Sequence, residues 1–272
     1  MGVTADNTDF NQIVRNYERL GEPMTRPFAL QVLDLVSLAP GDHVLDVATG
    51  TGVLAVAAAE RGARVLATDI APGMVTRTAE RLRPYAGCDA RVMKLEAIEA
   101  PTARFDSAFS LFGVLAFTTW PKGLSELVRV TRPGGQIVVT MWTERQDATP
   151  AVIMKRVFEE VFPGRELWPE GFFPSWSTCS LENALHWAGC EETEVQVCKA
   201  EWRPLSPSGD PMYPADALTE GDPMFRNFPG YNALTEMERA RLRAALSDAF
   251  AGQDGTIRLP TEAFVARGRK AE

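Results

Sequence analysis

The sequence predicts an α/β protein in which helices cover a doubly wound, mostly parallel sheet. Two observations lead to this prediction. Short, nearly continuous apolar runs alternate with helical patterns over residues 42–142, and such alternation is typical of parallel βαβ units. Two further strand patterns near the carboxyl terminus are expected to pair as antiparallel neighbours at the edge of the sheet.

The first 41 residues are expected to form two helices that cap the rest of the chain. Apolar residues recur at helical spacing from Phe10 to Leu20. The segment GEPMTRP at 21–27 is expected to break this helix, and a second helical run, FALQVLDLVSL, follows it.

Strand and helix signals then alternate as far as residue 142, and this half is expected to bind a cofactor. The expected strands are HVLDVA (43–48), ARVLATD (63–69), RVMKL (91–95), FDSAFSL (105–111) and QIVVTMW (136–142). The expected helices are the alanine-rich stretch 53–63, residues 72–82 with Pro72 in the first turn, and about 121–131.

Residues 143–272 are less regular and are expected to form the substrate half. The expected elements are a helix at 180–190, strands at 191–202 and 256–268, and a helix from a capping box at Thr235 and Glu238 to about Phe250. Segments 162–176 and 203–232 are rich in Pro, Gly and aromatic residues. Because long loops in a compact domain are usually lids or binding loops, we expect a lid at about 203–254.

Length, composition and charge exclude several classes of protein. The chain has 272 residues, of which 45% are apolar, and at ~150 residues per domain this is roughly 1.8 domains. Its net charge of −8 argues against nucleic acid or an anionic membrane as a partner, because both attract clustered Lys and Arg. The four cysteines form no C-x-x-C pair, so we expect buried thiols and no metal site.

No targeting or membrane segment is expected either. The longest uncharged stretch, residues 107–121, has 15 residues, whereas a membrane helix needs ~20 apolar ones. The amino-terminal MGVTADNTDF lacks the basic region and apolar run of a signal peptide. We therefore expect a cytoplasmic protein, and the sequence leaves its oligomeric state open, a homodimer included.

The stretch VLDVATGTG at 44–52 is the motif most indicative of function. A buried strand containing Asp46 is followed by a turn with Gly50 and Gly52 and then by a helix, a geometry that lets a ligand approach backbone N–H groups. The next strand ends in Asp69, 19 residues after Gly50. An acidic side chain there can accept hydrogen bonds from both hydroxyls of a ribose, so the motif indicates a nucleoside-containing cofactor.

Three observations favour S-adenosylmethionine over NAD, although GTGVLA at 50–55 also satisfies a dinucleotide pattern. Asp46 can face the cationic end of a methionine moiety, whereas it would repel a pyrophosphate. Two helices precede the first strand and could close over a compact cofactor. No tyrosine has a lysine four residues later, so the acid–base pair of a dehydrogenase is missing. An NAD-dependent oxidoreductase remains the alternative.

On these stretches the chain resembles the class I S-adenosylmethionine-dependent methyltransferases, in particular the small-molecule branch of ubiquinone and menaquinone biosynthesis. The matching stretches are VLDVATGTG, ARVLATDIAPGMV, KLEAIE, FDSAFSLFGVLAF and ELVRVTRPGGQIVVTMW, in family order and spacing. The resemblance implies a single Rossmann-like domain. Its sheet would have seven strands in the order 3-2-1-4-5-7-6, with strand 7 antiparallel.

The resemblance also implies which positions contact S-adenosylmethionine and its product S-adenosylhomocysteine. These are Ala48, Gly50 and Gly52 for the methionine and ribose, Asp69 for the ribose hydroxyls, Ile70 and Met74 beside the adenine, Glu96, Ala97 and Ile98 at the adenine amine, Ser110, Leu111 and Phe112 beside the methionine portion, and Tyr17 and Arg26 at the carboxylate. Glu96 stands where the family usually has Asp, and Ala48 stands where it usually has Gly. A plain surface charge is the alternative for Arg26.

Methyl transfer from a sulfonium needs alignment and exclusion of water more than it needs a base. The two histidines, His43 and His186, are expected to be packing residues, so no catalytic residue is assigned. The segment SLFG after the fourth strand lacks the D/N-P-P-Y/F motif of nucleic-acid amino-methyltransferases. A small-molecule acceptor is therefore expected.

Aromatic residues of the irregular segments suggest that this acceptor is apolar or aromatic. The candidate substrate-binding residues are Trp142, Trp176, Phe172 and Tyr213, and packing of the lid against the sheet is the alternative role for each. A protein that binds the cofactor without transferring methyl also remains open.

Overall fold

The computed structural model describes residues 10–145 and 147–272, so most of the amino-terminal stretch examined for a signal peptide lies outside it. Seven strands form one sheet in the order β3-β2-β1-β4-β5-β7-β6. Their bounds are β1 His43–Val47, β2 Arg64–Asp69, β3 Asp89–Val92, β4 Phe105–Leu111, β5 Thr131–Trp142, β6 Cys190–Trp202 and β7 Leu259–Lys270. Strand β7 is antiparallel to both of its neighbours, and the other neighbouring strands are parallel. The expected fold class, strand order and antiparallel strand are confirmed.

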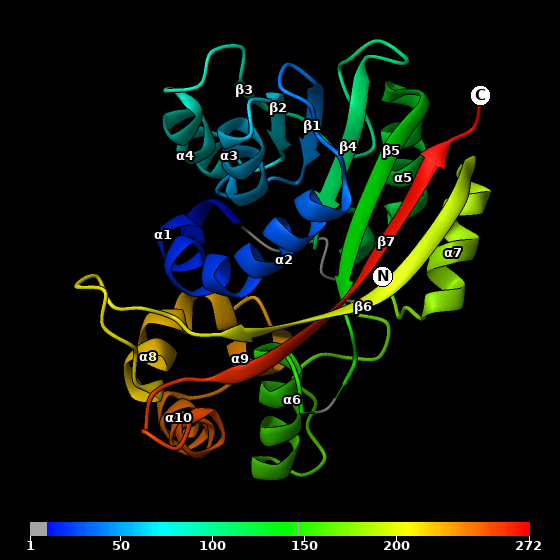
Figure 1. Cartoon of the computed structure of the whole chain (residues 1–272). Coiled ribbons are helices and arrows are strands. Elements are labelled where there is room, and N and C mark those ends of the chain that lie inside the picture. Colours follow the sequence, from blue (N-terminus) through cyan, green and yellow to red (C-terminus); the bar gives the residue numbers. More distant parts are fainter. Residues whose placement is uncertain (1–9, 146) are drawn as a thin grey trace.

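The helices connect these strands and continue beyond the sheet (Figure 1). Their bounds are η2 Phe10–Ile13, α1 Val14–Asn16, η3 Tyr17–Gly21, α2 Glu22–Leu35, α3 Val53–Glu60, α4 Pro72–Leu82, η4 Val114–Ala116, α5 Trp120–Val130, α6 Pro150–Val161, α7 Thr178–Trp187, α8 Pro214–Phe225, α9 Pro229–Asn232 and α10 Glu236–Phe250. Within the described residues, none of these helices combines the length and apolarity needed to cross a membrane.

The sheet has an apolar core on each face, because successive side chains of a strand point to opposite sides. On β1, Val44 packs with helices α2 and α3, whereas Leu45 packs with α5 on the other side. On β4, Phe109 lies on the same face as Val44, and Ala108 lies on the same face as Leu45. Strands buried on both faces read as continuous apolar runs, which is why their signal in the sequence is strong.

A third apolar cluster lies beyond the carboxyl ends of the parallel strands. It joins α6, α8, α9 and α10 around buried side chains such as Phe158 and Tyr231. Strands β6 and β7 are long, and in Figure 1 they run from the sheet to this helical cluster. At the far end of β6, Trp202 Nε1 donates a hydrogen bond of 2.8 Å to Leu20 O, so the cluster also contacts the amino-terminal helices.

Two expectations about helices differ from the structure. The segment 21–27 does not break the helix, since η3 and α2 run through it without interruption. Pro23 lies directly after the π-helical turn of η3, in the first turn of α2. Helix α6 was not expected. Segment 203–254, which was expected to form a lid, contains three helices. Helices α8 and α9 were not expected, and α10 begins at the expected capping box of Thr235 and Glu238.

Candidate active site

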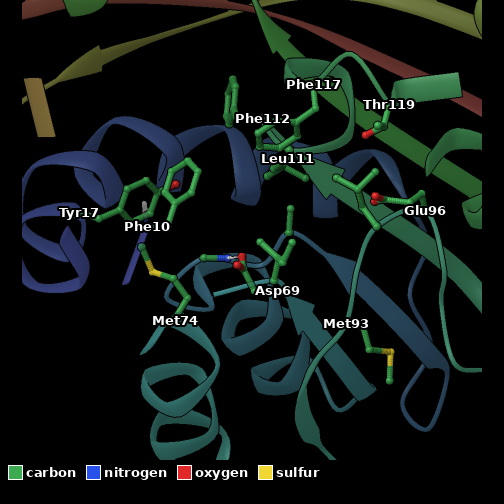
Figure 2. A pocket seen from close by; sticks show the side chains of 15 residues that line it. Phe10, Tyr17, Asp69, Met74, Met93, Glu96, Leu111, Phe112, Phe117 and Thr119 are labelled. Atoms are coloured by element: carbon green, nitrogen blue, oxygen red, sulfur yellow. Dashed lines mark hydrogen bonds between the residues drawn. The ribbon is translucent and has the colours of Figure 1, made fainter. Parts of the chain in front are cut away.

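A pocket opens at the carboxyl ends of the parallel strands, where the loops after β1, β2, β3 and β4 meet the amino-terminal helices (Figure 2). It has a volume of about 210 Å³, far more than one water requires. Its lining consists of Phe10, Tyr17, Ala48, Gly50, Asp69, Ile70, Met74, Met93, Leu95, Glu96, Leu111, Phe112, Gly113, Phe117 and Thr119. Ligands of open α/β sheets bind at this edge.

The loop between β1 and α3 brings bare backbone to one wall of the pocket. Ala48, Gly50 and Gly52 have φ angles of 57°, 57° and 88°, in the left-handed region that favours glycine. A Cβ atom on Gly50 would lie 3.2 Å from Tyr17 Cε1, and one on Gly52 would lie 2.8 Å from Thr78 Cγ2. Both glycines are therefore required by close approach as well as by backbone conformation.

Asp69, at the end of β2, occupies the middle of the pocket in Figure 2. Its Oδ2 accepts the N–H of Gly50 at 3.0 Å, and its Oδ1 accepts the N–H of Ala71 at 2.9 Å. Burial raises the pKa of Asp69, while these two N–H groups lower it. The carboxylate thus fixes two loops and still has acceptor capacity for a ligand, because each carboxylate oxygen can accept more than one hydrogen bond.

Asp46 lies beneath the loop and does not line the pocket. It is 2% exposed and accepts a hydrogen bond of 2.6 Å from Thr49 Oγ1. Burial raises the pKa of Asp46 to about 7, although the hydrogen bond from Thr49 opposes the rise. Its visible role is to hold the loop in shape. The expectation that it faces a cationic ligand remains a prediction.

The amino-terminal helices cover the pocket from the opposite side. Figure 2 shows Phe10 and Tyr17 close together on one side and Glu96 and Thr119 on the other. Met74, 1% exposed, packs beneath Tyr17. Burial, with the nearby carboxylates of Glu22 and Asp69, raises the pKa of Tyr17. The phenol therefore keeps its proton and can act as a hydrogen-bond donor.

A stack of aromatic rings borders the pocket beyond β4. The rings of Phe112 and Trp142 lie 3.8 Å apart at 16°, and Phe28 meets both edge-on at 5.7 and 5.5 Å. Phe112 has a φ of 56°, which turns the chain sharply at the end of the strand. Gly113 follows it, and a Cβ atom there would lie 2.4 Å from Ala48 Cβ. The loops after β1 and β4 therefore touch.

The structure brings nine of the expected cofactor positions into the pocket lining and leaves six outside it. Those in the lining are Tyr17, Ala48, Gly50, Asp69, Ile70, Met74, Glu96, Leu111 and Phe112. Those outside are Arg26, Asp46, Gly52, Ala97, Ile98 and Ser110. Arg26 is exposed on α2, Ile98 is 4% exposed in the core, and Ser110 donates to Val47 O at 2.8 Å.

The four expected substrate residues lie in separate places. Trp142 joins the aromatic stack beside the pocket. Trp176 lies behind η4, where its Nε1 donates to Leu115 O at 3.0 Å. Phe172 is buried against Trp168 and Phe173, and Tyr213 is 56% exposed at the start of α8. Of these four, Trp142 is the one in contact with the described pocket lining.

Six lining residues were not found from the sequence, namely Phe10, Met93, Leu95, Gly113, Phe117 and Thr119. Most of them follow β3 or β4 directly. Because all parallel strands end at the same edge of the sheet, every residue just after a strand was a candidate, and that signal was available. The position of Phe10, by contrast, depends on how the amino-terminal helices fold back.

Comparisons with known proteins agree with this geometry. A family model described as a methyltransferase domain matches residues 44–135. The demethylmenaquinone methyltransferase of Thermus thermophilus is 31% identical over 162 residues, which are 57% of this chain and 73% of that protein. An uncharacterized protein of Mycobacterium tuberculosis is 34% identical over 130 residues, which are 47% of either chain.

The solved structures include phosphoethanolamine N-methyltransferase 2 of Haemonchus contortus in complex with S-adenosyl-L-methionine. It has a TM-score of 0.60 and 17% identity, and the match covers 98% of this chain and 59% of that one. The chain spans about half the length of the curated relatives that match it at 34% identity. The family model's match, residues 44–135, contains most of the residues that line the pocket.

Proposed function

Since this chain belongs to the class I S-adenosylmethionine-dependent methyltransferases and is similar to their menaquinone-biosynthesis branch, we propose that it transfers a methyl group to a small apolar or aromatic molecule. The observation that carries the proposal is the pocket in which the bare backbone at Gly50 and the carboxylate of Asp69 face an aromatic wall. The backbone at Gly50 and the carboxylate of Asp69 suit a nucleoside, and the aromatic wall suits an apolar acceptor.

The residues present fit the cofactor. Asp69 would accept the ribose hydroxyls, Ala48 and Gly50 would lie along the methionine and ribose, and Ile70 with Met74 would flank the adenine. Glu96, from the loop after β3, would accept from the adenine amine. The cofactor supplies an electrophilic methyl group on a sulfonium. The acidic side chains of the pocket suit that positive charge.

The acceptor would bind next to Phe112 and Trp142, whose stacked rings border the pocket. In the described part of the chain, the pocket lining contains no His, Lys or Cys, and the Tyr17 phenol keeps its proton. The protein would therefore act by orienting the acceptor and excluding water. Acceptors that lose their proton before binding, or whose methylated form releases its proton to water, fit this site.

Two other functions have weaker support. An NAD-dependent oxidoreductase would belong to a different family from the one that this chain matches. A protein that binds the cofactor without methyl transfer is favoured only by the absence of a base in the described lining, and methyl transfer does not require one. We place the reaction in the cytoplasm because the four cysteines are free thiols, the state that a reducing compartment maintains.

The test combines binding and turnover. Calorimetry should show that the chain binds S-adenosylmethionine and S-adenosylhomocysteine and does not bind NAD. Incubation with fractionated cell extract and S-adenosylmethionine should release S-adenosylhomocysteine and yield a product heavier by one CH₂ by mass spectrometry. Binding of NAD alone would overturn the proposal. Cofactor binding without release of S-adenosylhomocysteine in any fraction would favour the non-methylating function.

A further inference from the structure

Outside the pocket lining, an ion pair between a buried glutamate and a half-buried arginine touches the loop that forms one wall of the pocket. Glu22, at the start of α2, is 8% exposed and pairs with Arg81 of α4. The Oε1 atom of Glu22 also accepts a hydrogen bond from Thr51 Oγ1. Arg81 Nη1 donates to Thr51 O at 2.8 Å. Both charged groups therefore meet at Thr51, in the centre of the loop.

The same loop is held at its neighbouring residue. Thr78 Oγ1, one turn before Arg81 on α4, donates to Gly50 O at 2.9 Å. Two successive carbonyl groups of the loop are thus fixed by side chains of one helix. This fixes the orientation of the peptide units next to the pocket, because a peptide is planar and turning its carbonyl also turns its N–H.

Glu22 is linked to Tyr17 as well. The backbone N–H of Glu22 donates to Tyr17 O across the wide π-helical turn of η3. The ring of Tyr17 lies over Gly50 and lines the pocket. Anchoring Glu22 therefore sets the place of Tyr17 on one side of the pocket and the loop on the other.

We propose that Glu22 and Arg81 are positioning residues of the pocket, which hold the loop at Thr51 and the helix that carries Tyr17 in the geometry that binds the cofactor. This inference rests on the proposed function of the pocket. It goes further in assigning cofactor affinity to two side chains that do not line the pocket. Neither residue is expected to contact the cofactor, so neither is a catalytic residue.

The chain offers a matched control one helical turn away. Glu18 pairs with Arg77 at 2.5 Å, and these residues lie four positions before Glu22 and Arg81 on the same two stretches of helix. The Glu18 and Arg77 side chains are 29% and 37% exposed. Among the described residues, Arg77 bonds to Glu18 and Glu80 and not to the loop. If an ion pair between these helices matters only for stability, breaking either pair should have the same effect on the Kd for the cofactor.

The experiment measures the Kd for S-adenosylhomocysteine by calorimetry in Glu22→Gln, Arg81→Met, the double variant and Glu18→Gln. We expect Glu22→Gln and Arg81→Met each to raise the Kd by about 10- to 100-fold, because small displacements at a binding site have effects of this size. The double variant should lose little more than either single one, since both break the same contact. Glu18→Gln should stay within about twofold of the wild type.

A purely structural role would lower the melting temperature without changing the Kd of the folded protein. Should Glu22→Gln fail to fold, Thr51→Val, which replaces the hydroxyl group with a methyl group, should raise the Kd about threefold. Kd values within about twofold of the wild type for Glu22→Gln and Thr51→Val would overturn the inference.

Amide hydrogen exchange of residues 48–52 without ligand gives a second readout. Exchange should become faster in Glu22→Gln and stay unchanged in Glu18→Gln, and equal exchange in both would contradict the positioning role. A wild-type protein that binds no S-adenosylhomocysteine would instead contradict the proposed function, and the exchange data would still decide whether the pair holds the loop.

Discussion

Asp69 combines two tasks at the edge of the sheet. Its carboxylate fixes the N–H groups of Gly50 and Ala71, and under the proposed function it also accepts from the ribose. We expect Asp69→Ala to weaken binding of S-adenosylhomocysteine by about 1–3 kcal/mol, the loss of charged hydrogen bonds. Calorimetry measures this loss. Asp106→Asn is the control, since Asp106 accepts from His43 and Arg132 at the opposite edge of the sheet, and equal losses in both would argue against Asp69.

Gly113 leads to a second prediction at the scale of single residues. In Gly113→Ala the new Cβ would lie 2.4 Å from Ala48 Cβ and 2.8 Å from Ser110 Oγ. We expect it to lower the free energy of unfolding by about 1–3 kcal/mol and to weaken cofactor binding, because the loop must move. Urea denaturation and calorimetry measure the two effects.

The matched rescue is Gly113→Ala combined with Ala48→Gly. It removes the closest contact and places glycine where φ is 57°, so it should regain a large part of the stability. No recovery in the double variant would show that the clash with Ala48 is not the cause.

Site residues at the ends of strands were easier to predict than site residues whose position depends on how the amino-terminal helices pack across the sheet. Asp69 and Gly50 could be placed from the sequence because Asp69 ends the buried strand β2 and Gly50 lies in the turn after the buried strand β1. Phe10 and the stack of Phe28 on Phe112 could not, since they depend on the path of the amino-terminal helices across the sheet. The Glu22–Arg81 pair joins residues 59 positions apart, and no local pattern encodes such a distance.

At the scale of elements, strands β1, β2, β4 and β5 were predicted well because their burial makes them continuous apolar runs. The strand expected at 91–95 is β3, Asp89–Val92, which is largely exposed and therefore gives a weaker signal. Helix α6 was missed although a signal was present. Pro150 stands in its first turn, and Ile153, Met154, Val157 and Phe158 follow at helical spacing. The expected break at 21–27 was wrong for another reason. Burial of Phe28 and Val32 stabilises α2 enough to accept Pro27 inside it.

Helix α10 allows a prediction that concerns stability alone. Its capping box pairs Thr235 with Glu238, whose Oε2 accepts the N–H of Thr235 at 2.8 Å. Thr235→Ala should lower the free energy of unfolding by about 1 kcal/mol and leave the Kd for S-adenosylhomocysteine unchanged. Thr219→Ala, at an exposed hydroxyl inside α8, should change stability by less than about 0.5 kcal/mol. A fall in cofactor affinity for Thr235→Ala would contradict this prediction, because it would show that α10 is coupled to cofactor binding.

At the scale of the whole molecule, Asp46 should make stability depend on pH. Burial raises its pKa to about 7, whereas an unfolded Asp titrates near ~3.9. Between these values the folded state holds the proton and the unfolded state has lost it, so the free energy of unfolding falls as pH rises from about 4 to about 7. Below about pH 4, the contribution of protonated Asp46 to the free energy of unfolding is fully present.

The variant Asp46→Asn cannot ionise and can still accept from Thr49. Its stability relative to the wild type should increase on the order of 1 kcal/mol or more between pH 5 and pH 8. Urea denaturation at several pH values measures this change. A stability curve for Asp46→Asn that runs parallel to that of the wild type over this pH range would refute the assignment.

The pairing of Trp202 with Leu259 at the ends of β6 and β7 has a consequence for protein engineering. The segment 203–258, with helices α8 to α10, leaves the sheet and returns to it on adjacent strands, about 5 Å apart. A segment with neighbouring ends can be exchanged as a cassette without changing the order of the strands. Chimaeras that graft this segment from a relative should therefore keep the cofactor half intact, provided that the graft covers the apolar side of α6.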